Sequence, residues 1–167
     1  MIYSGINTWN ANLENDLIEK LLAKHESGFF EEIVAKLLVN MGYGSSYDDI
    51  IQLKGGPGDG GIDGIIKQDV LGLDKVYIQA KQWDDNKPVP SSKMREFVGA
   101  LGQKKAAKGV YITTSRFTEP AVQCAKEVKE TIVLIDGQAL AKLMIEYNIG
   151  VQLEDTILIK KIDEDFF

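Results

Sequence analysis

The sequence is poor in the residues that build several common kinds of active site. It contains one cysteine, Cys124, and one histidine, His25, in 167 residues. A single cysteine excludes an internal disulfide and fits a reducing compartment. Because His25 lies among polar residues just before a predicted helix, we expect it on the surface rather than in a nucleophilic or zinc site. Hydrolytic chemistry here would therefore rest on carboxylates, lysines and a hard cation such as Mg²⁺.

Two further absences concern location and partners. No apolar run approaches the roughly 20 residues that cross a bilayer, and the chain does not begin like a signal peptide. We therefore expect a cytoplasmic protein with no membrane partner. The net charge of −6 argues against a protein that coats nucleic acid by bulk attraction. It does not exclude a nucleic-acid enzyme, because carboxylates that hold metal make the count negative.

Apolar residues at helical spacing predict five helices. The first carries apolar residues from Leu13 to Leu22, and the second is expected to begin with Ser27 as its cap and to close at Gly42. The third follows a break at 88–92, the fourth opens at Thr118 with a proline in its first turn, and the fifth covers 138–147.

Short apolar runs predict strands between these helices. After a glycine-rich turn at 55–61, the predicted strands are 62–66, 76–80, 109–114 and 132–135, with further strands at 50–53 and, at an edge, 157–162. The order is helix, helix, three strands, and then alternating helix and strand. It predicts one α/β domain, a three-layer sandwich with a central mixed β-sheet flanked by helices.

Three polar residues fall at the ends of the first two of these strands. Gln79 and Lys81 project from the same face of one strand because alternate side chains share a face, and an adjacent strand can bring Asp63 beside them. A carboxylate, an amide oxygen and an ammonium are what metal-assisted phosphodiester hydrolysis needs. The spacing alone is a weak signal, since a salt bridge between Asp63 and Lys81 at the strand ends would produce it too.

Longer motifs contain these residues. They read Gly58-Asp59-Gly60-Gly61-Ile62-Asp63-Gly64 and Tyr77-Ile78-Gln79-Ala80-Lys81-Gln82-Trp83. Together they look like the catalytic core of the Mrr family of restriction endonucleases, in the PD-(D/E)xK nuclease superfamily. The resemblance covers nearly the whole chain after the first helix, through Phe29-Phe30-Glu31, Met41-Gly42-Tyr43-Gly44, Phe97-Val98-Gly99-Ala100-Leu101, Lys108-Gly109-Val110-Tyr111-Ile112-Thr113-Thr114-Ser115 and Ile132-Val133-Leu134-Ile135-Asp136-Gly137.

The resemblance implies a role for each residue of the site. Asp63 would bind the metal, Gln79 would supply a neutral oxygen ligand where most of the superfamily has Glu or Asp, and Lys81 would stabilise the developing charge. Glu31 would add an acid from the preceding helix. It matches the family's Phe-Glu pair and falls at the margin of the inward helix face, whereas Glu32 points away. Asp59 matches an acid in the family's glycine turn and is a secondary candidate, or a simple turn residue.

Two features bear on DNA contacts. Gln82 departs from the family, whose members often carry Arg after the lysine, so one phosphate contact is in doubt. Basic residues in and around the third helix either follow DNA phosphates or form a solvated helix face; they are Lys93, Arg95, Lys104, Lys105, Lys108 and Arg116.

The resemblance implies a restriction-endonuclease-like fold and cleavage of double-stranded DNA with Mg²⁺, which Mn²⁺ can replace. It also implies type IV restriction of modified, typically methylated, DNA near the bacterial nucleoid. We expect a catalytic domain at 27–167, preceded at 1–26 by an N-terminal helix or linker remnant. The resemblance implies an upstream winged-helix DNA-binding module, which is absent from this chain. Cutting two strands favours a homodimer or higher oligomer. The rival functions are a structure-specific repair or junction nuclease and a non-catalytic, DNA-associated interaction domain on the same fold.

Overall fold

A computed structural model describes residues 2–44, 62–69, 71, 73–84, 86–156, 161–162 and 165, with side chains from residue 9 onwards. The helices and strands of the described residues appear in the following order along the chain: α1 (Ile2–Leu22), α2 (Phe29–Asn40), β1 (Gly64–Lys67), β2 (Lys75–Lys81), α4 (Ser91–Gln103), β3 (Lys108–Thr113), α5 (Glu119–Glu127), β4 (Thr131–Ile135) and α6 (Gly137–Glu146). The expected strands at 50–53 and 157–162 and the glycine turn at 55–61 lie wholly or mostly outside these residues.

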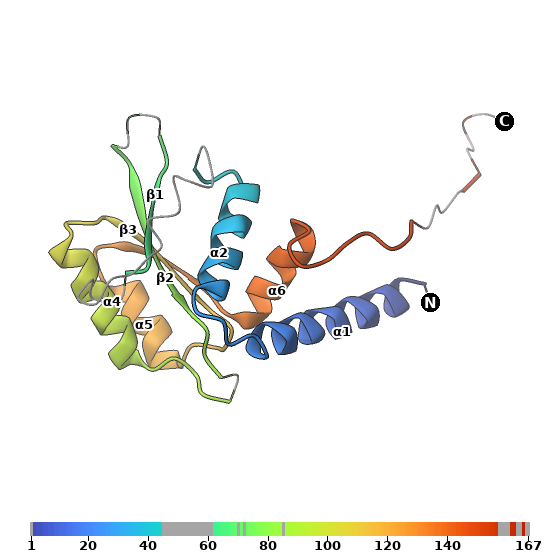
Figure 1. Ribbon diagram of the computed structural model, residues 1–167, viewed down its shortest axis with the longest axis horizontal. Helices are drawn as coiled ribbons and strands as arrows, with labels where there is room; N and C mark the ends of the chain where they lie inside the picture. Colours follow the sequence, from blue (N-terminus) through green and yellow to red (C-terminus); the bar gives the residue numbers. More distant parts are fainter. Residues whose placement is uncertain are drawn as a thin grey trace.

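The four strands form one mixed sheet in the order β1-β2-β3-β4. β1 and β2 are antiparallel, whereas β2, β3 and β4 run parallel and are joined through α4 and α5. Helices α4 and α5 cover one face of the sheet and α2 and α6 cover the other, which gives three layers (Figure 1). The expected three-layer sandwich with a central mixed β-sheet flanked by helices is therefore confirmed.

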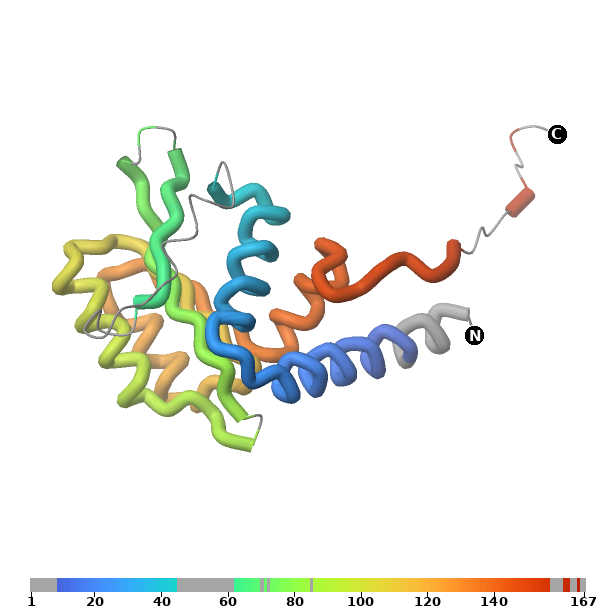
Figure 2. The backbone as a smooth tube through the Cα atoms, viewed as in Figure 1, coloured from blue at the N-terminus to red at the C-terminus, as the bar shows by residue number. Residues whose placement is uncertain are grey.

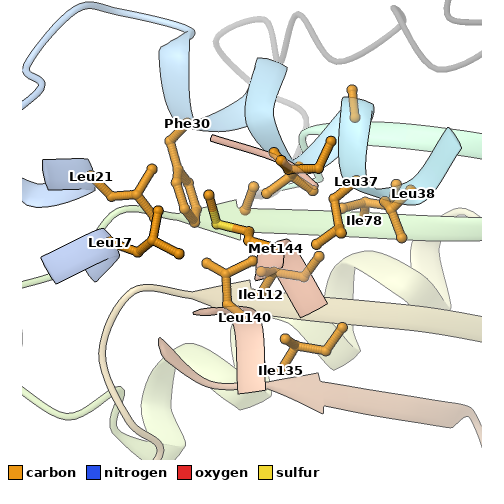
Figure 3. Packing of buried hydrophobic residues seen from close by; sticks show 14 of the residues in the cluster. Leu17, Leu21, Phe30, Leu37, Leu38, Ile78, Ile112, Ile135, Leu140 and Met144 are labelled. Atoms are coloured by element: carbon orange, nitrogen blue, oxygen red, sulfur yellow. The ribbon is translucent and has the colours of Figure 1, made fainter. Parts of the chain in front are cut away.

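Each face of the sheet packs a separate apolar core. Leucines of α1 and α2 pack with Leu140 and Met144 of α6 against Ile78 and Ile112 of the sheet (Figure 3). On the other face, Met94, Phe97 and Leu101 of α4 pack with Tyr77 and Tyr111. Alternation along β2 and β3 sends successive side chains to the two cores. Gln79 and Lys81 therefore project toward the α4 side, and Gln82 returns to the α2 side.

The helix ends confirm most of the expected caps and correct one. Thr118 accepts a hydrogen bond from Ala121 N at the start of α5, and Gly42, with a φ of 90°, closes α2. The prediction that Ser27 caps α2 is wrong. The N-cap is Gly28, with a φ of 85° and no side-chain cap. The left-handed turn before α2 requires glycine and leaves the serine one position too early.

Candidate active site

Asp63 and Gln79 stand opposite each other on neighbouring strands. Gly64 pairs with Ile78 in the antiparallel ladder, and Asp63 N extends that ladder by donating to Ile78 O at 2.8 Å. The Gln79 amide donates through Nε2 to Asp63 Oδ2 at 2.7 Å, and Ala80 N donates to the same oxygen at 2.8 Å. Two donors thus hold one oxygen of a carboxylate at the sheet edge.

The surroundings of Asp63 disfavour its negative charge. Burial raises the pKa of its carboxyl above the ordinary value, and the nearby carboxylate of Glu31 raises that pKa further. The Ala80 N–H, the Lys81 ammonium and the Gln79 amide lower the pKa but do not cancel the effect of burial. A half-buried acid that is close to a second acid and to a lysine is a common arrangement at functional sites.

Two oxygen atoms at this place accept no hydrogen bond from the residues that the structure describes. They are Asp63 Oδ1 and Gln79 Oε1. Carboxylate and amide oxygens are the ligands that hard divalent cations prefer. The described residues hold no group of three His, Cys, Asp or Glu side chains of the kind that binds a metal alone. The donor set fits a cation that also takes water or phosphate oxygens.

Glu31 and Glu32 point in different directions from the first turn of α2. Glu32 is exposed and pairs with Lys36 at 2.7 Å. Glu31 is partly buried and lines a cavity of about 530 Å³ together with Gln82 and Trp83, next to the end of β2. Glu31 is also close enough to Asp63 for its charge to raise the pKa of that carboxyl, whereas Asp59 lies outside the described residues.

Sequence reasoning did not assign the contacts of Gln82. Its Nε2 donates to the main-chain oxygens of Leu21 at 2.8 Å and Lys24 at 2.9 Å, with a longer contact to Leu22 O at 3.4 Å. The side chain thus binds the carboxyl end of α1. The departure from arginine was visible in the sequence, but nothing in it pointed to a partner about 60 residues upstream.

Tyr111 is a second residue that sequence reasoning did not place near the site. It pairs with Gln79 in the parallel ladder and is 2% exposed, between the rings of Phe97 and Phe117. Burial, followed by the charges of Asp63 and Glu96, raises its pKa to about 12. The phenol therefore stays neutral, and its buried ring lies on the strand next to Gln79.

The basic residues suggested for DNA contacts divide between two ends of the molecule. Lys93 and Arg95 lie at the start of α4, and Arg116 follows β3, near the end of β2 that carries Lys81. Lys104 and Lys105 follow the other end of α4, roughly 18 Å along its axis. Lys108, at the start of β3, is paired with Asp74. The structure therefore brings only the first three residues to the end of the sheet that carries the site.

The amino-acid sequence matches a known protein family and a characterised relative. The family model Mrr_cat, described as restriction endonuclease, matches residues 22–144. The chain is 46% identical over 153 residues to the type IV methyl-directed restriction enzyme EcoKMrr of Escherichia coli strain K12. The match covers 92% of this chain but 48% of that relative, so the chain spans about half its length.

Solved structures of low sequence identity share the fold. The DNA modification-dependent restriction endonuclease AspBHI superposes with a TM-score of 0.64 at 19% identity, over 85% of this chain and 36% of its own. The MspJI restriction endonuclease in complex with a 27-mer oligonucleotide superposes with a TM-score of 0.58 at 24% identity, over 82% of this chain and 33% of its own. Both chains are much longer than this one.

Proposed function

The chain belongs to the Mrr catalytic-domain family of restriction endonucleases, a family that generally uses a divalent metal, and from this premise we propose that it is an Mg²⁺-dependent endonuclease that hydrolyses phosphodiester bonds of double-stranded DNA. The observation that carries the proposal is the juxtaposition of Asp63 and Gln79, each with an oxygen that no described residue uses, beside Lys81.

Each residue has a distinct task in this proposal. Asp63, Gln79 and Glu31 would hold the cation, which Mn²⁺ could replace. When bound, the cation polarises the scissile phosphate and activates water. The Gln79 amide, whose NH₂ group now faces Asp63, would rotate by half a turn so that its oxygen lies beside the carboxylate. The Lys81 ammonium donates to phosphate oxygens and stabilises the negative charge that develops on them.

The name of the similar enzyme supports a proposal for the substrate, and the chemistry of double-strand cleavage supports one for the assembly. Because the similar enzyme is named as methyl-directed, we propose that the substrate is modified DNA in the bacterial cytoplasm. The part of the relative that this chain does not match is long enough for a separate module that reads the modification. A double-strand break needs two active sites, so the active species is expected to be a dimer or larger.

The test is metal-dependent nicking of plasmids prepared from methylating and non-methylating hosts. We expect cleavage of the methylated plasmid with Mg²⁺ or Mn²⁺, no cleavage with EDTA, and a loss of about a thousandfold in Asp63→Ala and Lys81→Ala. Glu32→Ala is the control and should keep wild-type cleavage, because it removes an exposed carboxylate that is paired with Lys36 and has no role in the proposed site. Cleavage that survives in Asp63→Ala would refute the proposal. Preference for branched over modified linear DNA would favour a junction nuclease.

A further inference from the structure

We propose that Gln82 is a positioning residue, which fixes the junction of α1 and α2, and with it Glu31, against the strand that carries Gln79 and Lys81. The inference rests on the proposed function only in assigning Glu31 to the metal. It gives Gln82 a role other than the phosphate contact that the sequence had put in doubt, because the Gln82 amide is already bound to the main chain of α1.

The contacts of Gln82 form a cap at the end of a helix. The last carbonyl oxygens of an α-helix have no partner within the helix. Gln82 Nε2 supplies donors to Leu21 O at 2.8 Å and Lys24 O at 2.9 Å, at the place where α1 ends. Figure 2 shows the α1–α2 junction lying beside the strand that leads to this residue. The amide therefore joins two parts of the chain that no regular secondary structure connects.

The main chain on both sides of Gln82 is held in place. Lys81 precedes it and pairs with Thr113 in the sheet. Trp83 follows it, and Trp83 N and O exchange hydrogen bonds with Thr114 Oγ1 at 2.8 Å and 2.6 Å. The main chain at Gln82 therefore has little freedom to move. Through its side-chain hydrogen bonds, Gln82 holds the α1–α2 junction in a fixed position relative to the sheet.

The other end of this connection reaches Glu31. Lys24, whose oxygen Gln82 binds, is seven positions before Glu31, and only a short turn ending at Gly28 separates α1 from α2. Glu31 and Gln82 line the same cavity of about 530 Å³. If the cap is lost, the turn is free to move, and Glu31 can leave the neighbourhood of Asp63.

The experiment compares three variants of the full chain. Gln82→Glu keeps the shape but sets a carboxylate against carbonyl oxygens, so it breaks the cap. Gln82→Arg restores N–H donors and adds a positive charge that the end of a helix favours. Gln103→Glu makes the same chemical change at an exposed position at the end of α4 and is the control. Thermal melting sets a temperature at which every variant is folded.

The readouts are chosen so that a purely structural role would not change them all. For Gln82→Glu we expect the Mg²⁺ concentration at half-maximal cleavage and the dissociation constant of Mn²⁺, counted by electron paramagnetic resonance, to rise about tenfold. Hydrogen exchange at residues 23–28 should accelerate, while the KM for DNA at saturating metal stays unchanged. Gln82→Arg should return the Mg²⁺ concentration at half-maximal cleavage, the dissociation constant of Mn²⁺ and the rate of hydrogen exchange toward their wild-type values.

Other outcomes overturn the inference. A change in the KM for DNA alone would make Gln82 a DNA contact. If Gln82→Glu melts at a lower temperature but keeps wild-type metal binding and wild-type hydrogen exchange in the folded state, the cap is merely structural. Manganese binding and exchange do not require cleavage, so a wild-type chain that fails to cut DNA refutes the proposed function while these two readouts still decide the role of Gln82.

Discussion

At the scale of single residues, Asp63 shows the conflict between stability and function. Its partly buried carboxyl has a raised pKa, so the ionised form that a metal needs is the form that the fold disfavours. The Gln79 amide relieves part of this cost by donating to Asp63 Oδ2. A glutamate in place of Gln79 would bring a second negative charge to the same contact.

We predict that Asp63→Asn melts at a higher temperature than the wild type near neutral pH in EDTA, while cleavage falls about a thousandfold. A raised folded-state pKa favours the protonated acid. The stability that Asp63 contributes is complete below its unfolded-state pKa and is lost as the pH rises through the folded-state pKa. The advantage of the variant should therefore shrink as the pH falls through that range.

Melting curves between about pH 4 and about pH 7 measure this difference. Mg²⁺ should raise the melting temperature of the wild type only, because the ligand binds its folded state. A variant that is less stable than the wild type near neutral pH without metal would contradict the assignment of burial as the main cause.

At the scale of helices and strands, the carboxyl end of β3 is built by close contacts. Gly137 N donates to Ser115 O at 2.7 Å, and a Cβ added at Gly137 would lie 2.2 Å from Thr114 O. The start of α6 thus lies directly on the main chain that continues from β3. Thr114 in turn holds Trp83, so this contact supports the end of β2 as well.

Gly137→Ala should destabilise the protein by about 1–3 kcal/mol or more, because a main-chain oxygen cannot rotate out of the way of the new methyl group. Cleavage should fall as well, since Thr114 moves with its main chain. Gly102→Ala is the control: its new Cβ meets nothing within 4 Å at an exposed position of α4, and alanine in a helix stabilises by up to about 1 kcal/mol relative to glycine. Urea unfolding of both variants measures the difference; equal stabilities would show that α6 can shift freely.

At the scale of the whole molecule, the candidate site, the start of α4 and Arg116 share one end of the sheet. The N-terminal part of α1 and the segment after α6 extend away from the sheet on the other side of α2 (Figure 1). No helix among the described residues is both long and apolar enough to cross a bilayer.

Because the candidate site, the start of α4 and Arg116 share one end of the sheet, a DNA duplex at the site would meet Lys93, Arg95 and Arg116 before the residues beyond the other end of α4.

Arg116→Ala should weaken DNA binding for every sequence and lower the slope of log affinity against log salt by about 0.9, the value for one lost phosphate contact. Lys104→Ala should leave that slope unchanged, because Lys104 follows the far end of α4. Fluorescence anisotropy with a short duplex in a salt series, with Ca²⁺ to prevent cleavage, measures both slopes. If only Lys104→Ala changes the slope, DNA lies at the opposite end of the sheet.

The sequence by itself determined the kinds and order of the described helices and strands, because apolar periodicity and turn residues act over short distances along the chain. It also indicated Asp63, Gln79 and Lys81. Alternation along a strand placed Gln79 and Lys81 on one face, and the resemblance of the surrounding motifs to the Mrr family, not the spacing, singled out the three residues. Only the tertiary structure decided that Gln79 donates to Asp63, that Gln82 caps α1, and that the end of β3, which Arg116 follows, lies beside the end of β2 that carries Lys81. These contacts join residues far apart in the chain, and their partners depend on how the layers pack.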